Sequence, residues 1–184
     1  MHALRSLRIL PVALAIAGVA AACGGSASAS TCTDDGRTIP VPDQIAGLQV
    51  HPSEKARATL LKEREETQTY LCDVTVFELR DGAKADDELI AVLQVIRMTD
   101  DARVDDIDFL REIANGVGAG QSKTPPKIQG IFVWQTEQNQ QFLNLWFQER
   151  FMQVLIVRQT TQLGDPVPAP AVLEEVLKLR PVDA

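Results

Sequence analysis

Residues 128–158 constrain the fold more than any other part of the chain. Apolar and polar side chains alternate through this stretch, and the polar pairs Asn139–Gln140 and Glu149–Arg150 divide it into segments of similar length. Alternation with a period of two residues is typical of β-strands, and short polar breaks are typical of tight turns. The stretch therefore predicts three consecutive antiparallel strands.

The register of these strands follows from burial, because a slip of one residue would turn every side chain to the opposite face. Two-residue turns place one apolar set on a single face, which we expect to be a core face: Ile128, Phe132, Trp134, Leu143, Leu145, Phe147, Met152, Val154 and Ile156. The other face carries polar side chains and also a second apolar set: Ile131, Val133, Phe142, Trp146, Phe151, Leu155 and Val157. A sheet with two apolar faces needs cover on both sides.

Further strands are predicted upstream. Alternating side chains predict a strand over residues 70–79, and the nearly continuous apolar run Leu89–Met98 is typical of a central strand covered on both faces. Gly47–His51 is short and ends before Pro52, which indicates an edge strand.

Three segments show helical spacing of their apolar residues. Residues 54–66 follow Ser53, a suitable N-cap. Apolar residues between Val104 and Val117 also have helical spacing, and Asp101 or Asp105 could start that helix. A final helix carries one apolar stripe: Val172, Leu173, Val176 and Leu177. We therefore expect an α+β fold, an antiparallel β-sheet with helices packed on both faces in an α/β/α sandwich.

Residues 1–22 have the pattern of an export signal. A basic head containing Arg5 and Arg8 precedes a short apolar stretch that ends in small residues. This pattern is typical of a signal peptide and is too short for a comfortable membrane span. Residues 23–30 are rich in Gly, Ser and Ala and predict a flexible tether, so we expect a single domain over residues 31–184.

The sequence Val19-Ala20-Ala21-Ala22-Cys23 resembles the lipobox of bacterial lipoproteins, although Leu is the commonest residue of that family where this chain has Ala20. The resemblance implies cleavage before Cys23, a diacylated thiol and an acylated amine, so that acyl chains such as palmitate hold the protein on the extracytoplasmic face of the cell membrane. The alternative is an ordinary secretory signal cut near Ala22 or Ala27.

The order of strands and helices over residues 70–180 is similar to that of the Mog1/PsbP-like α/β/α domains found in some actinobacterial lipoproteins. This similarity rests on element order and not on a residue motif. It therefore implies a fold and carries no functional residues to this chain.

Cleavage before Cys23 leaves two cysteines, Cys32 and Cys72. Export places them in an oxidising compartment, where an even number favours a disulfide between them. Closing the long intervening loop would stabilise the fold by about 3–4 kcal/mol. The alternative is a buried Cys72 thiol beside a free Cys32.

The charged residues and the histidine are interpreted as structural residues and not as catalytic or metal-binding ones. The formal net charge of −7 disfavours nucleic-acid binding. In the acidic cluster from Asp81 to Glu112, the acids between Asp100 and Asp108 are interpreted as a helix start, and a weak calcium site in the cluster is the alternative. His51, the only histidine after cleavage, has no Gly-x-Ser-x-Gly motif to complete a catalytic triad. We expect no catalytic residues, no metal and no cofactor.

Trp146 is the central candidate for binding, because it lies on the second apolar face with Phe142, Phe151 and Leu155 around it. An uncovered face would form an apolar groove, whereas a covering C-terminal helix would bury Trp146. We interpret the protein as a membrane-anchored lipoprotein, a non-catalytic binding or accessory module of the cell envelope. Its expected partners are the membrane through Cys23 and an envelope protein or an amphipathic lipid. The alternative is an envelope hydrolase that uses Asp and Glu carboxylates.

Overall fold

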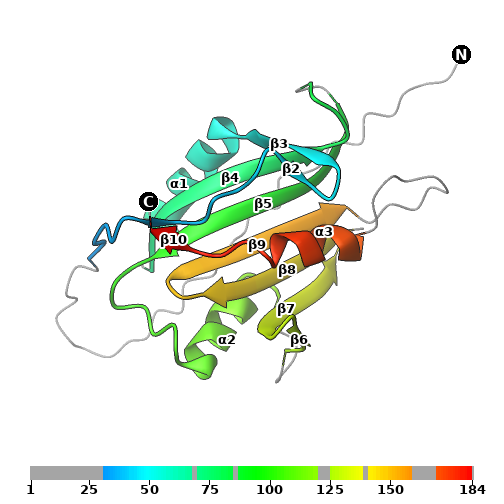
Figure 1. Cartoon of the computed structure of the whole chain (residues 1–184). Coiled ribbons are helices and arrows are strands. Elements are labelled where there is room, and N and C mark those ends of the chain that lie inside the picture. Colours follow the sequence, from blue (N-terminus) through cyan, green and yellow to red (C-terminus); the bar gives the residue numbers. More distant parts are fainter. Residues whose placement is uncertain are drawn as a thin grey trace, which may run out of the picture.

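The computed structural model describes residues 31–67, 70–84, 87–119, 125–138, 141–158 and 169–183. In these residues the chain is a mixed α+β structure dominated by an antiparallel sheet (Figure 1). Its helices are α1 (Glu54–Thr67), α2 (Ile107–Gly116) and α3 (Ala169–Val176). Its strands are β1 (Arg37–Thr38), β2 (Gln44–Ile45), β3 (Leu48–Pro52), β4 (Leu71–Arg80), β5 (Leu89–Met98), β6 (Lys127–Ile128), β7 (Ile131–Gln138), β8 (Gln141–Gln148), β9 (Phe151–Arg158) and β10 (Val182–Asp183).

The main sheet has the strand order β2-β3-β4-β5-β9-β8-β7-β6. One half is built from β2 to β5 and the other from β6 to β9, and the two halves meet where β5 pairs with β9. The strands β1 and β10 form a separate two-stranded sheet near the two ends of the described chain (Figure 1).

The predicted register of β8 and β9 is confirmed. Trp146 lies opposite Gln153 on β9 and opposite Val133 on β7, while Leu145 lies opposite Val154. The predicted turn at Glu149–Arg150 is present, whereas the predicted turn at Asn139–Gln140 lies outside the described residues.

The beginning of the first predicted strand differs from the prediction. The chain turns at Gln129 and Gly130, whose φ angles are 52° and 83°, so that β6 runs back along β7. Ile128 consequently packs on the opposite side from Trp134, and Phe132 is 37% exposed. Placing Ile128 in one core face with Trp134 was wrong, because a hairpin turn with two positive φ angles is usually marked by Asn-Gly and not by Gln-Gly. Phe132 does share the face of Trp134, two residues further along β7, but it is exposed and not part of the core.

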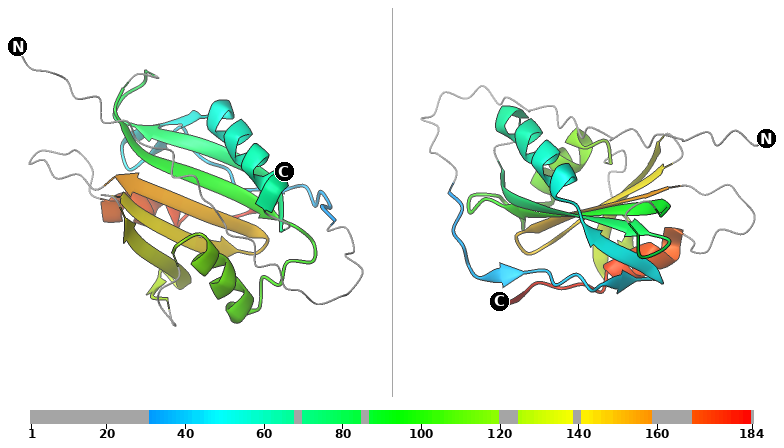
Figure 2. Two further views of the ribbon diagram at one scale, coloured as in Figure 1. Left: turned by 180° about the vertical axis from the view of Figure 1, so that it is seen from behind. Right: turned by 90° about the horizontal axis from the view of Figure 1, so that it is seen from above.

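Alternate side chains of the sheet fall into two separate apolar clusters. The α3 cluster contains the buried residues Ile39, Ile45, Leu48, Leu79, Ile90, Ala91, Leu93, Val95, Val133, Trp146, Phe151, Leu155, Val157, Val172, Leu173, Val176 and Leu177. The α2 cluster contains Leu71, Val74, Val76, Ile96, Met98, Phe109, Leu110, Ala114, Val117, Ala119, Trp134, Leu143, Leu145, Met152 and Val154. Figure 2 shows α1 and α2 lying along the same side of the sheet.

The helix boundaries follow from local capping. The segment predicted as a helix after Ser53 is confirmed as α1. The helix α2 starts later than expected because its N-cap is Asp106, whose carboxylate accepts hydrogen bonds from the amides of Asp108 and Phe109 at 3.0 and 3.2 Å. Neither Asp101 nor Asp105 starts this helix.

Burial of Trp146 generates a stability prediction. We expect Trp146→Ala to lower the free energy of unfolding by about 3–5 kcal/mol, because the side chain is 0% exposed and its removal leaves a cavity in the α3 cluster. Phe132→Ala, at a position 37% exposed, serves as the control and should cost less than about 1 kcal/mol. Urea unfolding followed by circular dichroism measures both, and equal losses would contradict the described burial.

Candidate functional site

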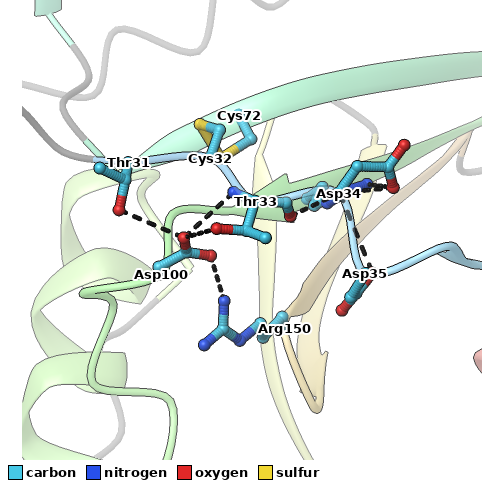
Figure 3. Close-up of a disulfide and its surroundings, with 9 residues drawn as sticks. Thr31, Cys32, Thr33, Asp34, Asp35, Cys72, Asp100 and Arg150 are labelled. Carbon is cyan, nitrogen blue, oxygen red and sulfur yellow. Dashed lines mark hydrogen bonds and ion pairs between the residues drawn. A yellow bond between two sulfur atoms is a disulfide. The ribbon is translucent and has the colours of Figure 1, made fainter.

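A disulfide joins the beginning of the described chain to the sheet. Cys32 and Cys72 are bonded with an S–S distance of 2.03 Å and a Cα–Cα distance of 5.5 Å, which confirms the predicted pair (Figure 3). The bond closes a loop between residues 40 positions apart and ties the N-terminal segment to β4. The alternative of a free Cys32 is wrong.

Asp100 binds the start of the described chain, residues 31–33, beside this disulfide. Its Oδ2 atom accepts hydrogen bonds from the Thr31 hydroxyl at 3.2 Å, the Thr33 amide at 3.0 Å and the Thr33 hydroxyl at 2.5 Å. The Thr33 hydroxyl is the largest of the contacts that together hold the pKa of Asp100 below its ordinary value, against a smaller opposing effect of burial.

Two arginines complete this arrangement. Arg150, in the turn between β8 and β9, donates to Oδ1 of Asp100. Arg97 on β5 donates to the Thr33 carbonyl at 2.7 Å and to the Asp34 carboxylate at 2.9 Å. Residues 31–34 are therefore bound to β4, to β5 and to Asp100 just after β5 (Figure 3).

Three of the four residues expected to form a binding groove lie in the core. Trp146 and Leu155 are 0% exposed, Phe151 is 5% exposed, and Phe142 is partly buried. Trp146 shares the α3 cluster with side chains of α3, as the alternative interpretation of a covering C-terminal helix predicted. These four side chains do not form a surface groove in the described structure. Cys23, the expected site of lipid attachment, lies outside the described residues.

A pocket of about 280 Å³ lies beside the Glu149–Arg150 turn, with Glu149 on its wall. Most of its wall is apolar, and it lies between the start of α2 and strands β7 and β8. The residues that line it are Val104, Asp105, Leu110, Gly130, Ile131, Phe132, Trp134, Phe147 and Glu149. Trp134 and Phe147 meet edge to face, with ring centroids 5.7 Å apart.

The charged side chains around the pocket differ in their pairing. Glu149 forms an ion pair with Arg37. Its backbone φ angle is +53°, a value that residues other than glycine rarely adopt. Arg103 pairs with Asp106 at 3.1 Å. Asp105 is exposed and has no ion-pair partner among the described residues, so it contributes an uncompensated negative charge to the wall.

The other titratable candidates have structural contacts. The Nε2 atom of His51 lies 3.3 Å from the Gly82 carbonyl. Burial is the largest influence on the pKa of Glu78 and raises it, but bonds from Arg80 and Ser53 together hold the pKa below its ordinary value. Within the described ranges no group of three or more His, Cys, Asp or Glu side chains is arranged to hold a metal ion.

Sequence patterns did not single out this pocket. Its aromatic residues were predicted as core residues, and Asp105 was considered as a helix cap or as part of a weak calcium site. The hairpin between β6 and β7 brings Gly130 and Phe132 to the wall, and Gly130 is the one residue of its turn that sequence patterns associate with a positive φ angle.

Comparison of the chain with models of protein families, with curated proteins and with solved structures found no match. Among the described residues no helix is long and apolar enough to cross a membrane.

Removal of the disulfide is expected to destabilise the domain. Replacing Cys32 and Cys72 together by Ser should lower the free energy of unfolding by about 3–4 kcal/mol, because the unfolded chain regains the freedom of a loop spanning 40 positions. Urea unfolding under oxidising conditions measures the loss. Reduced wild-type protein is the control and should match the double variant.

The lowered pKa of Asp100 predicts an acid-dependent loss of stability. Because the folded state binds its proton more weakly than the unfolded state, the stabilisation by Asp100 is present above the unfolded pKa of about 3.9 and is lost as the pH falls through the folded pKa. Asp100→Asn should therefore lower the melting temperature at pH 7, and the difference from wild type should narrow below about pH 4.

Asp81→Asn, at an exposed position, controls for the loss of one negative charge. Amide hydrogen exchange of Thr33 gives a local measurement, since its N–H donates to Asp100 and should exchange faster in Asp100→Asn. An unchanged exchange rate at Thr33 would contradict the described bond.

Proposed function

We propose that the protein is a lipoprotein anchored through Cys23 to the extracytoplasmic face of the cell membrane, and that its domain is a non-catalytic binding or accessory module of the cell envelope. The signal-like pattern of residues 1–22 and the lipobox-like sequence support the anchor. The Cys32–Cys72 disulfide also supports an oxidising compartment outside the cytoplasm.

We further propose that the domain is an α/β/α sandwich of the Mog1/PsbP-like kind. Support comes from the two apolar clusters, because one contains side chains of α2 and the other contains side chains of α3. Alternate residues of β8 and β9 contribute to different clusters, which is the pattern expected when a sheet lies between two helical layers.

The pocket beside the Glu149–Arg150 turn is the observation that carries the binding role. Its volume of about 280 Å³ is close to the lower end of the range of small-molecule sites, and its wall is largely apolar with two carboxylates. Glu149 on its wall directly precedes Arg150, which is bonded to Asp100. The pocket therefore lies close to the place where residues 31–34 are held, on the part of the domain that a short tether would keep near the bilayer.

Carboxylate-based hydrolysis, the alternative function, receives less support. A glycosidase general acid needs a carboxyl group whose pKa is raised, so that it is protonated at the working pH. Glu78 and Asp100 both have lowered pKa values, and both are bonded to arginines that hold parts of the fold together.

Cys23→Ala tests the anchor. We expect the wild-type protein to sediment with membranes after cell fractionation and the variant to appear in the soluble or secreted fraction, because the acyl chains would be lost. Cys32→Ala is the matched control and should leave the protein with the membranes. Membrane association that is equal in wild type and Cys23→Ala would refute lipid anchoring at Cys23.

In-cell photo-crosslinking tests the binding role. A photoreactive residue at Phe132, which lines the pocket and is 37% exposed, should crosslink to an envelope protein or an amphipathic lipid. The same probe at Val182, which is 42% exposed on β10, controls for accessibility. Mass spectrometry of the products identifies the partner, and identical products from both positions would argue against a site at the pocket.

A further inference from the structure

The charged side chains that line the pocket favour a cationic ligand over an anionic one. Asp105 and Glu149 are its charged lining residues, and the rest of the lining is apolar or glycine. Arg37 partly compensates Glu149, and Asp105 has no ion-pair partner in the described part of the chain. A cation would gain from the Asp105 carboxylate, whereas an anion would be repelled.

The aromatic residues of the pocket favour a cation that can pack against the faces of their rings. Phe132, Trp134 and Phe147 line the pocket, and Trp134 is 1% exposed, so it forms the base while the two phenylalanines supply more accessible ring surface. Lys127 already lies over the Phe132 ring, with its Nζ atom 4.5 Å from the centroid. Because the Lys127 ammonium already occupies one face of Phe132 and adds a positive charge beside the pocket, a ligand cation depends on the remaining ring surface and on the Asp105 carboxylate.

Hydrogen-bonding capacity separates one class of cation from another. A primary ammonium has three N–H donors to satisfy in different directions, whereas the lining side chains offer acceptors only on Asp105 and on Glu149, which is already paired with Arg37. A quaternary ammonium has no N–H donor, spreads its charge over methyl groups and suits a wall of rings and aliphatic side chains.

We propose that this pocket binds a quaternary ammonium group, with the methyl groups against Phe132, Trp134 and Phe147 and the charge toward Asp105. This inference rests on the proposed binding function and names its ligand class. A choline lipid headgroup and a free trimethylammonium compound share this chemistry, and the nearness of the pocket to the held N-terminal segment makes both sources accessible to a tethered domain.

Choline and its neutral carbon analogue, 3,3-dimethylbutan-1-ol, form the decisive pair of probes. The purified full-length mature protein is titrated in octyl glucoside micelles, which contain no ammonium group, and binding is followed by calorimetry and by tryptophan fluorescence. Choline should bind at least about fivefold more tightly than the alcohol, because the alcohol lacks the charge that both the rings and Asp105 attract. Equal affinity for the two probes, or no binding of choline, would overturn the inference.

Variants locate the site. Asp105→Asn and Phe132→Leu should each weaken choline binding about two- to fivefold at low salt, and raising the salt concentration should weaken the wild type toward Asp105→Asn. Glu112→Gln removes one negative charge at an exposed position of α2, away from the pocket lining, and is the matched control. An equal effect of Asp105→Asn and Glu112→Gln would place the bound cation elsewhere.

Two further measurements are needed. One distinguishes a lipid headgroup from a free ligand, and the other distinguishes failure of the proposed ligand class from failure of the proposed binding function. Micelles doped with phosphatidylcholine should compete with choline if headgroups enter the pocket, and those doped with phosphatidylglycerol should not; competition by neither assigns the site to free ligands. Loss of choline binding with persistent crosslinks from Phe132 would reject the ligand class and keep the binding function. Absence of both signals would reject both.

Discussion

The pairing of β5 with β9 is the interaction on which the rest of the structure depends. It joins the half of the sheet formed by β2 to β5 to the half formed by β6 to β9, over a register from Ala91 opposite Val157 to Arg97 opposite Phe151. Each strand has apolar side chains on both faces, so this single pairing brings together residues of the α3 cluster and of the α2 cluster. Without it, neither cluster would have strands from both halves of the sheet.

Much of the fold could be predicted because the deciding patterns are local. The strand Leu89–Met98 was predicted at the bounds it has in the structure, since an apolar run of that length rich in β-branched residues has few other uses. The register of Trp146 opposite Gln153 also followed from burial alone. The disulfide could be inferred by counting cysteines after the expected cleavage, without any geometry.

The remaining features depend on contacts between distant residues or on unusual backbone conformations. The turn at Gln129–Gly130 needs two positive φ angles, and glutamine gives little indication of one. Asp100 was predicted as part of a helix start, but its partners Thr31, Thr33 and Arg150 lie far from it in the sequence. The pocket likewise combines residues of α2, β7 and β8, so no single segment could indicate it.

The position of the disulfide decides how the domain would carry mechanical load. The pair β1 and β10 consists of two-residue strands and would separate easily under tension applied to the N-terminus. Cys32 precedes β1, however, and is bonded to Cys72 within β4, a ten-residue strand paired on both sides. A pull on the chain before Thr31 is therefore transmitted to the start of β4 in the main sheet, and the short pair at the chain ends is spared.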